Sequence, residues 1–528
     1  MTLRLRPIHL ALLLALGSVS AQAGDLMQAY DLARQSDPQL AGSEANKRAE
    51  EEGIGISRSA LLPQISATAD LSKSRNNNSS FSSFPDGQGG VSFGQSKSSS
   101  DTKNRSYTAN LQQSIYDHSN YTRLKASSSR AEQFDALYDN AADALITRVA
   151  QAYFNVLSAI QDLASSRAQE RALKRQLDQA NVRLQVGLAP ITDAQEAKAQ
   201  YDIARAATIN FDTALSDARE ALTEITGQPI EHYRGLAPDF AASAPSPIDV
   251  DAWVKMAVDK NPQIRAQQLS LDASNHDVDT ARAGHLPTLT FTASYGDRAQ
   301  WGSSDFNGHN EPATNSGNGP AYSLVFQVPI FSGFAVSSRV RQALATRDAA
   351  ADTLEQTRRS ITRQARNAYH ATLGGLSAIE ARKQALLSAQ TALEATQTGL
   401  EVGTRTIVDV LISEKTLFQA QSDYAHARNN FVVNGLLLKQ AAGNIQASDL
   451  AAVNALLVSD AEAALDAKDD ASDIAMPGLP SRPAKASEAD KASTTDKAAA
   501  PMKKHKKAKK KQADQDLPPA TTDAPDIR

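Results

Sequence analysis

An internal duplication is the feature of this sequence that most restricts its fold. The segment from Asp25 to Gln39 matches the segment from Asp249 to Gln263 at an offset of 224 residues, and Leu62-Pro63 matches Leu286-Pro287 at the same offset. Beyond residue 150 the offset becomes 216, which superposes Val186-Gly187 on Val402-Gly403. A sequence that repeats itself at a fixed offset indicates that the same structural unit occurs twice in the chain. We therefore expect a first structural repeat over 24–248 and a second over 249–460.

Both repeats have the same order of expected elements. A short helix opens each one, a proline starts a second helix, and a Leu-Pro pair ends it. Two stretches that alternate apolar and polar residues with the period of a strand follow, and between them we expect a polar loop, at 74–106 in the first repeat. The expected bounds in the first repeat are strands at about 64–74 and 106–116, a long helix at 117–186 and a return helix at 191–226. Those in the second are strands at about 288–297 and 321–331, a long helix at 334–402 and a return helix at 404–442.

The two long helices dominate the expected mass. Residues 117–186 contain neither glycine nor proline, and at 1.5 Å per residue such a helix is about 105 Å long. Apolar and small residues recur along it in steps of three and four, as in a coiled coil. Each long helix is expected to turn back at a glycine, Gly187 or Gly403, which makes two helical hairpins.

The N-terminus has the pattern of a secretory signal. Arg4 and Arg6 precede an apolar core at 10–16, and Ala21-Gln22-Ala23 is a small-residue cleavage site, so we expect a signal peptide over 1–23. A retained signal anchor is the alternative, but the apolar run is short for a membrane span. The chain has no cysteine, which excludes disulfides, thiolate metal sites and an acylated N-terminal cysteine.

After the signal, no apolar run approaches the 18 or more residues of a membrane-spanning helix. The chain is therefore either soluble or enters a membrane as strands. Its four expected strands have the length of transmembrane β-strands, yet four strands cannot enclose a lumen, because known outer-membrane barrels use at least eight. We expect three copies to share a barrel of twelve strands above twelve tunnel helices. A soluble β-sandwich beside a helical hairpin is the alternative.

The last segment, 461–528, is rich in Ala, Asp, Lys, Pro and Thr and includes a lysine-rich run at 503–511. We expect a disordered polar tail, because so little apolar surface cannot offset the entropy of ordering. A basic run can contact nucleic acid, but in an exported chain of net charge −4 we expect no nucleic-acid partner.

No enzyme motif is present. The nine histidines lack His-x-x-x-His spacing, and neither Gly-x-Ser-x-Gly nor a phosphate-binding Gly-x-x-x-x-Gly-Lys occurs. We expect no catalytic residue, no cofactor and no metal.

The two hairpin turns carry a family resemblance. The turn at 402–411 (Val-Gly-Thr-Arg-Thr-Ile-Val-Asp-Val-Leu) resembles the periplasmic tip of the TolC outer-membrane efflux family, and 187–195 resembles its first-half equivalent. The resemblance covers about residues 25–460. It implies a helix-dominated mixed fold, namely a trimeric twelve-stranded β-barrel in the outer membrane, a long α-helical tunnel in the periplasm and a small mixed α/β equatorial domain.

The resemblance also implies a function and partners. Members are exit ducts for drug efflux and type I protein secretion, which dock on a periplasmic adaptor (membrane fusion protein) and an inner-membrane RND or ABC transporter and open by an iris-like movement of their tips. An outer-membrane diffusion porin or adhesin and a soluble periplasmic coiled-coil scaffold are the alternatives. The porin or adhesin leaves the long helices unexplained, and the scaffold leaves the strands unexplained.

Site residues follow by position from the same resemblance. Asp409 occupies the position of an acidic ring in the lumen, whereas the second acidic position holds Ile412, so cation block is expected to be weaker unless nearby Glu414 substitutes. The entrance links correspond to Thr192, Asp193 and Arg405, and Leu400 stands where the family has a tyrosine. The adaptor-contact tips are Val186, Gly187, Leu188, Val402, Gly403 and Thr404. Independently of the family, Asp193 and Asp409 lie where an acidic residue caps a helix, which is the alternative role for both.

Overall fold

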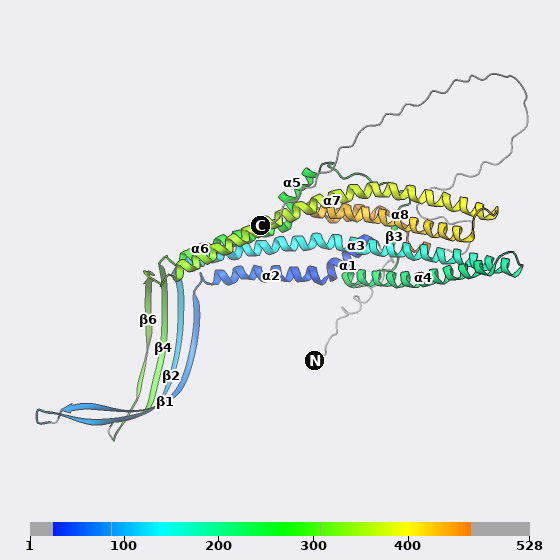
Figure 1. The fold of residues 1–528 in the computed structure, drawn as a ribbon. Helices are drawn as coiled ribbons and strands as arrows, with labels where there is room; N and C mark the ends of the chain where they lie inside the picture. The colour runs from blue at the N-terminus through cyan, green and yellow to red at the C-terminus, as the bar shows by residue number, and fades with distance from the viewer. Residues whose placement is uncertain (1–24, 86, 307, 466–528) are drawn as a thin grey trace, which may run out of the picture. The chain divides into compact units, whose positions relative to one another are not determined.

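The computed structural model describes residues 25–465 apart from residues 86 and 307. The expected signal over 1–23 and most of the expected tail lie outside the described residues. The described chain is dominated by helices, with one antiparallel sheet of long strands and a second, two-stranded sheet. The element order of the first half recurs in the second (Figure 1).

Short paired helices open each repeat. Asp37 caps the second helix by accepting a 2.8 Å hydrogen bond from the Leu40 backbone N–H, with Pro38 in the first turn; Asn261 does the same for its counterpart through the Gln263 N–H, at 2.9 Å. These caps satisfy N–H groups that a helix start leaves free. The four helices are α1 (Leu26–Ser36), α2 (Pro38–Ser59), α5 (Val250–Lys260) and α6 (Pro262–Ala283).

The large sheet runs in the order β1-β2-β4-β6, all antiparallel, and the short β5 also pairs with β4. Its central pairing, β2 with β4, joins the two repeats. In the described chain β1 and β6 each have one edge without a partner strand. The bounds are β1 (Gln64–Pro85), β2 (Val91–Tyr116), β4 (Thr288–Phe306), β5 (His309–Pro312) and β6 (Asn315–Gln327).

The strands differ from the sequence-based expectation in length. The polar loop expected at 74–106 is wrong, because β1 and β2 stay paired through it, with Ser74 opposite Thr102 and Asn77 opposite Ser99. Backbone hydrogen bonds hold such a ladder whatever the side chains are, so apolar alternation ends before the strand does. For the same reason β4 continues past 297 to Phe306. The sixth strand ends at Gln327 rather than 331, just before Pro329, which lacks an N–H to donate.

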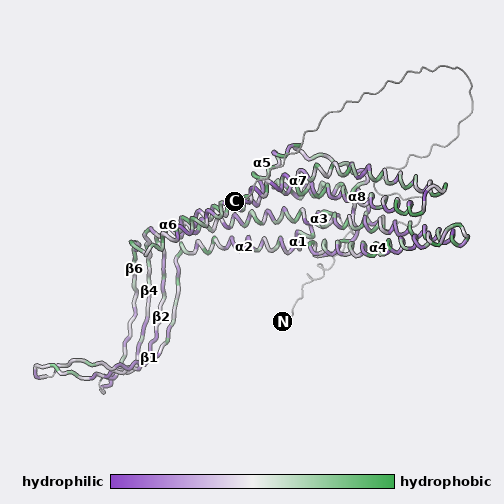
Figure 2. The backbone as a smooth tube through the Cα atoms, viewed as in Figure 1, coloured by the Kyte–Doolittle hydropathy of each residue, from purple (hydrophilic) through white to green (hydrophobic). Residues whose placement is uncertain are grey.

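Four long helices form two hairpins. The first hairpin packs α3 on α4, the second packs α7 on α8, and α3 also contacts α2, α6 and α8 (Figure 1). Figure 2 shows hydrophilic and hydrophobic residues mixed along these helices, and among the described residues no helix is both long and apolar enough to cross a membrane. Their bounds are α3 (His118–Gln185), α4 (Ile191–Thr226), α7 (Ala335–Glu401) and α8 (Ile407–Ala441).

The main core surrounds the middle of α3. Tyr153 is fully buried there, and its hydroxyl donates to the Arg234 carbonyl at 3.1 Å and accepts from the Arg234 N–H at 2.9 Å. Leu26, Leu450 and Leu457, from the two ends of the described chain, complete this core. The adjoining small elements are β3 (Arg234–Leu236), which pairs with β7 (Leu457–Asp460), and α9 (Ala447–Asn454).

The start of the expected tail is ordered, which corrects the boundary at 461. Residues 462–464 form a short 3-10 helix, and Glu462 accepts a 2.6 Å hydrogen bond from Arg219 of α4. Leu465 packs against the main core. Composition could not show this, because the Arg219–Glu462 ion pair and the packing of Leu465 depend on tertiary contacts.

Candidate functional site at the helical tips

The first tip is a glycine turn between α3 and α4. Gly187 has a φ of +73°, which side chains with a Cβ rarely adopt. The Leu188 N–H donates to the Arg183 carbonyl at 2.8 Å and so closes the end of α3. After Pro190 the chain returns as α4.

The second tip winds around Gly399. Gly403 has a φ of +79°, and the Gly399 carbonyl accepts the Thr404 N–H at 2.8 Å, the Arg405 N–H at 3.1 Å and the Thr404 hydroxyl at 3.1 Å. A Cβ at Gly399 would stand 2.6 Å from Cγ of Arg405. Sequence reasoning did not single out Gly399, although a glycine four residues before the turn glycine was a usable signal.

The tips expose apolar side chains. Leu188 is 79% exposed, Val402 69% and Val186 62%, while Gly187, Gly403 and Thr404 lie in the same two turns. Exposed apolar residues grouped at a tip are typical of a protein-contact surface. Their contact with an adaptor stays a prediction.

Asp409 caps α8 in the structure. Its carboxylate accepts from the N–H and the hydroxyl of Thr406, both at 2.9 Å, and its own N–H donates to the Thr406 hydroxyl at 3.3 Å. This reciprocal pair is a capping box. The backbone and hydroxyl hydrogen bonds from Thr406, with the charge of Arg405 nearby, hold the pKa of Asp409 below its usual value.

The three entrance-link residues do not meet within one chain. Asp193 lies in the first turn of α4 and is partly exposed, and Thr192 beside it is exposed. Among the described residues no hydrogen bond or ion pair joins either of them to Arg405, whose aliphatic stem lies over Gly399. Leu400, at the family's tyrosine position, carries no hydroxyl to donate.

Glu414 is not placed to replace a second acidic ring. It is buried, with 6% of its surface exposed. Burial raises its pKa, opposed by a hydrogen bond from Gln176 and the charge of Arg175, both of α3. Ile412 is 60% exposed instead. The expectation that Glu414 could substitute is therefore wrong, because its face of α8 packs against α3.

A second polar cluster joins the hairpins away from the tips. His426 of α8 lies 2.9 and 3.0 Å from the two carboxylate oxygens of Asp162 of α3, and the Ser422 hydroxyl donates to Asp162 at 2.5 Å. The hydrogen bond with Asp162 and the charges of Asp162 and Asp423 raise the pKa of His426, against its partial burial. Sequence reasoning missed this cluster, because it did not foresee that α3 and α8 are neighbours.

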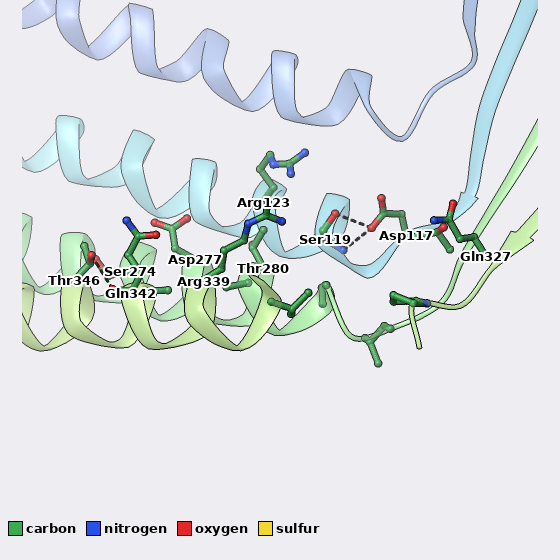
Figure 3. A pocket seen from close by; sticks show the side chains of 18 residues that line it. Asp117, Ser119, Arg123, Ser274, Asp277, Thr280, Gln327, Arg339, Gln342 and Thr346 are labelled. Carbon is green, nitrogen blue, oxygen red and sulfur yellow. Dashed lines mark hydrogen bonds between the residues drawn. The ribbon is translucent and has the colours of Figure 1, made fainter. Parts of the chain in front are cut away.

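A cavity lies where the strands join the helices. It measures about 700 Å³ and is lined by charged and polar side chains of several elements, among them Arg123 of α3, Asp277 of α6 and Arg339 of α7 (Figure 3). Val336, which also lines it, is separated from the tip at Val402 by almost the whole of α7, about 100 Å of helix. Within the described ranges no group of His, Asp and Glu has the arrangement to hold a metal ion.

This architecture matches that of a known protein family. The family model described as "Outer membrane efflux protein" matches residues 29–228 and 253–444, one segment in each repeat. The outer membrane protein TolC of Escherichia coli (strain K12) is 37% identical over 458 residues, which cover 85% of this chain and 88% of the relative. TolC of Vibrio cholerae is 34% identical and covers 86% and 98%. The proteases secretion protein PrtF of Dickeya chrysanthemi is 26% identical and covers 85% and 94%.

Solved structures share the fold. CusC superposes with a TM-score of 0.64 at 15% identity, covering 81% of this chain and 96% of that one. VceC of Vibrio cholerae gives 0.60 at 18% identity, covering 79% and 96%. The matched family is named for transport across the outer membrane rather than for catalysis. With 37% identity to TolC across most of both chains and both repeats matched, the chain belongs to the TolC family of outer membrane efflux proteins.

Proposed function

We propose that three copies of this chain form an exit duct in the outer membrane for drug efflux, type I protein secretion or both. The observation that carries the proposal is the large sheet. Its two outer edges have no partner strand in the described chain, and it exposes apolar residues such as Ile65 (76%), Tyr322 (73%) and Phe326 (65%). Free edges require partner strands, and an apolar face requires an apolar medium.

Strand number supports three copies. Each chain supplies four long strands, β1, β2, β4 and β6, and three chains supply twelve, above the minimum of eight for an outer-membrane barrel. The same symmetry gathers the four long helices of each chain into a periplasmic tunnel, with the small β3–β7 sheet and its neighbouring helices as the equatorial domain. Apart from its contacts with α5, α6 and α8, α7 is mostly exposed, which leaves a face for a neighbouring copy.

The relatives support both kinds of cargo. PrtF is named a proteases secretion protein and AprF of Pseudomonas aeruginosa an alkaline protease secretion protein, while BepC of Brucella suis is named an outer membrane efflux protein. We assign cargo selection to the inner-membrane RND or ABC transporter. The duct fractionates with the outer membrane as a heat-resistant trimer, and its deletion sensitises cells to efflux substrates. A diffusion porin would not change that susceptibility in a transporter-dependent way, and a soluble scaffold would not fractionate with the membrane.

The tips dock on a periplasmic adaptor through Val186 to Leu188 and Val402 to Thr404. Cysteine crosslinking tests this without background, because the native chain has no cysteine. A Leu188→Cys variant should capture the adaptor in cells. Ile209→Cys, 61% exposed farther along α4, is the matched control. Equal capture from both positions, or none from Leu188→Cys in cells that still export, would contradict docking at the tips.

Asp409 forms an acidic ring in the lumen, and Thr192, Asp193 and Arg405 link neighbouring tips until an iris-like movement opens them. Two substitutions separate the capping role of Asp409 from the effect of its charge on the lumen. Asp409→Asn keeps a hydrogen-bond acceptor and removes the charge, whereas Thr406→Ala removes the capping partner and keeps the charge. We expect Asp409→Asn, but not Thr406→Ala, to weaken divalent-cation block in single-channel recordings. The reverse pattern would leave Asp409 a helix cap only.

Arg405→Ala tests the links. It should raise the conductance of the resting channel if Arg405 bonds across the entrance. A conductance equal to that of wild type would show that Arg405 does not help to hold the entrance closed.

A further inference from the structure

One face of the large sheet changes from apolar to charged along its strands. Ile65, Leu71 and Tyr107 share this face with Tyr295 and Tyr322, because side chains alternate along a strand and the register places Ala69 opposite Tyr107, Ala109 opposite Tyr295 and Ala293 opposite Tyr322. All five are at least half exposed. The three tyrosines form a diagonal row across β2, β4 and β6, in which Tyr107 is level with Ala69, Tyr295 with Ala67 and Tyr322 with Ile65. Such a stagger is that of tilted strands in a barrel, so the row would mark one level at the end of an apolar band.

Cations follow directly beyond this row on the same face. Lys73 and Arg75 continue the series of Leu71, and Lys103 and Arg105 continue that of Tyr107. The Arg105 guanidinium lies 5.3 Å from the Tyr107 ring centroid. These four residues, Lys73, Arg75, Lys103 and Arg105, are the cation cluster.

Among the described residues, carboxylates neutralise the cation cluster only in part. Asp101 contacts Lys73 at 3.4 Å and Arg75 at 2.7 Å, and Asp297 contacts Arg105 at 3.4 Å. Lys103 has neither an ion pair nor a side-chain hydrogen bond among the described residues, and it stands directly opposite Lys73 in the β1–β2 register. Like charges directly opposite each other destabilise a strand pair. Two carboxylates against four cations leave an excess of positive charge that an external anion would relieve.

The position of the cation cluster indicates where that anion comes from. Lys73 is nine residues beyond the start of β1, about 30 Å along the strand. At the tilt of a membrane barrel this matches an apolar band about 25 Å tall, and tyrosines mark the edge of such bands. Cations just past the tyrosine row would therefore lie at headgroup level, at the end of the band away from the helices.

We propose that the cation cluster binds the phosphate groups of phosphorylated saccharide lipids, the lipopolysaccharide headgroups of the outer leaflet. Lysine and arginine are the side chains that bind phosphate, and the unpaired Lys103 beside Lys73 provides two adjacent ammonium groups for it. Arg105 and Arg75 flank them. This assignment rests on the proposed barrel.

The test uses the full-length protein purified in detergent and bis-phosphorylated lipid A as the probe, with binding measured by native mass spectrometry. Lys73→Gln/Lys103→Gln should bind lipid A about 25-fold more weakly, from about a factor of five for each lysine near an anionic surface. Arg298→Gln is the matched control, because Arg298 is exposed at a similar level, opposite Ser106, but on the other face of the sheet. It should bind like wild type. Asp101→Asn removes a competing carboxylate and should bind more tightly.

Three further measurements identify the ligand. Lipid A without its phosphates should bind wild type as weakly as intact lipid A binds the double variant, and inorganic phosphate at millimolar concentration should not displace lipid A. Wild-type affinity in the double variant, an equal loss in Arg298→Gln, or displacement by free phosphate would overturn the site. Equal binding to phosphatidylglycerol vesicles would overturn the saccharide headgroup as the ligand.

The same preparations distinguish a failure of the proposed lipid site from a failure of the proposed duct. The double variant should still reach the outer membrane and conduct ions like wild type. If it does so and binds lipid A normally, the lipid site alone is wrong. If the wild-type chain does not reach the outer membrane, both the duct and the lipid site are wrong.

Discussion

At the scale of single residues, Gly399 distinguishes a close-contact glycine from an ordinary helical one. Glycine to alanine within a helix stabilises by up to about 1 kcal/mol through propensity, and a Cβ added at Gly374 of the same helix would meet no atom within 4 Å. Gly374→Ala should therefore raise the thermal unfolding midpoint. Gly399→Ala should lower it or speed hydrogen exchange at the tip, because its Cβ meets Arg405. Equal gains from both would show that the tip turn adjusts freely.

Glu414 is a buried carboxyl with a raised pKa. A raised folded-state pKa means that ionisation destabilises the fold above about pH 4.5, the ordinary value, and that the penalty disappears below it. Glu414→Gln should therefore be more stable than wild type at pH 7, and this advantage should vanish near pH 4. Thermal unfolding at both pH values checks this. Glu394→Gln, at an exposed position of α7, is the control and should change little.

The sequence predicted the role of single residues correctly where one residue type determines the backbone conformation, as glycine does at a turn. Gly187 and Gly403 are the turn residues expected from the sequence, both with positive φ. Sequence position could not distinguish the burial of Glu414 from the exposure of Ile412, because the face of α8 that meets α3 follows from tertiary packing. The roles of Asp409, Thr192, Asp193 and Arg405 in gating remain predictions.

At the scale of elements, helices were easier to place than strands. The long helices start and stop at local signals, such as the Asp117 cap and the two glycine turns, so their observed ends lie within one residue of those expected. The return helix α8 begins at Ile407 rather than 404, because the Thr406–Asp409 capping box fixes its start. Strand lengths could not be predicted from alternation, because β1 and β2 pair through polar serines and asparagines.

We expect the contact between α3 and α8 to depend on pH through His426, which lies 2.9 Å from Asp162. Its raised pKa means that the ion pair with Asp162 contributes fully below about pH 6.5 and is lost as the pH rises through the folded-state pKa. His426→Gln should lower stability by about 1 kcal/mol or less at pH 6, since the pair is partly exposed, and by less at pH 9. Unfolding at the two pH values measures the difference. The exposed His285→Gln is the control, and a loss independent of pH would contradict the ion pair.

At the scale of the whole molecule, the small β3–β7 sheet ties the end of the described chain to its middle. Arg219 and Glu462 reinforce it. Ending the chain after Leu465 should leave the unfolding midpoint and outer-membrane fractionation unchanged. Ending it after Leu456 removes β7 and buried Leu457, and should lower stability by about 2–5 kcal/mol. Equal stability of the two truncations would contradict a structural role for β7.

The duplication predicted the order of elements in both halves, but it did not predict that one half would bury many more residues than the other. The core gathers around α3, whereas α7 has far fewer buried residues. Two sequences that match in pattern can differ in burial. Within the described residues α3 of the first repeat packs against α1, α8 and α9, whereas α7 of the second repeat has fewer neighbours.

The free edges of β1 and β6 have a consequence for biogenesis. A single chain in the periplasm carries two unsatisfied rows of backbone groups beside an apolar face, which is a template for uncontrolled pairing as well as for the correct partner. In the proposed trimer, ring closure removes both edges at once. Folding of that trimer would be a concentration-dependent competition between closing a ring and growing an open chain, so the proposal implies that a cell keeps newly exported copies scarce or escorted until three have met.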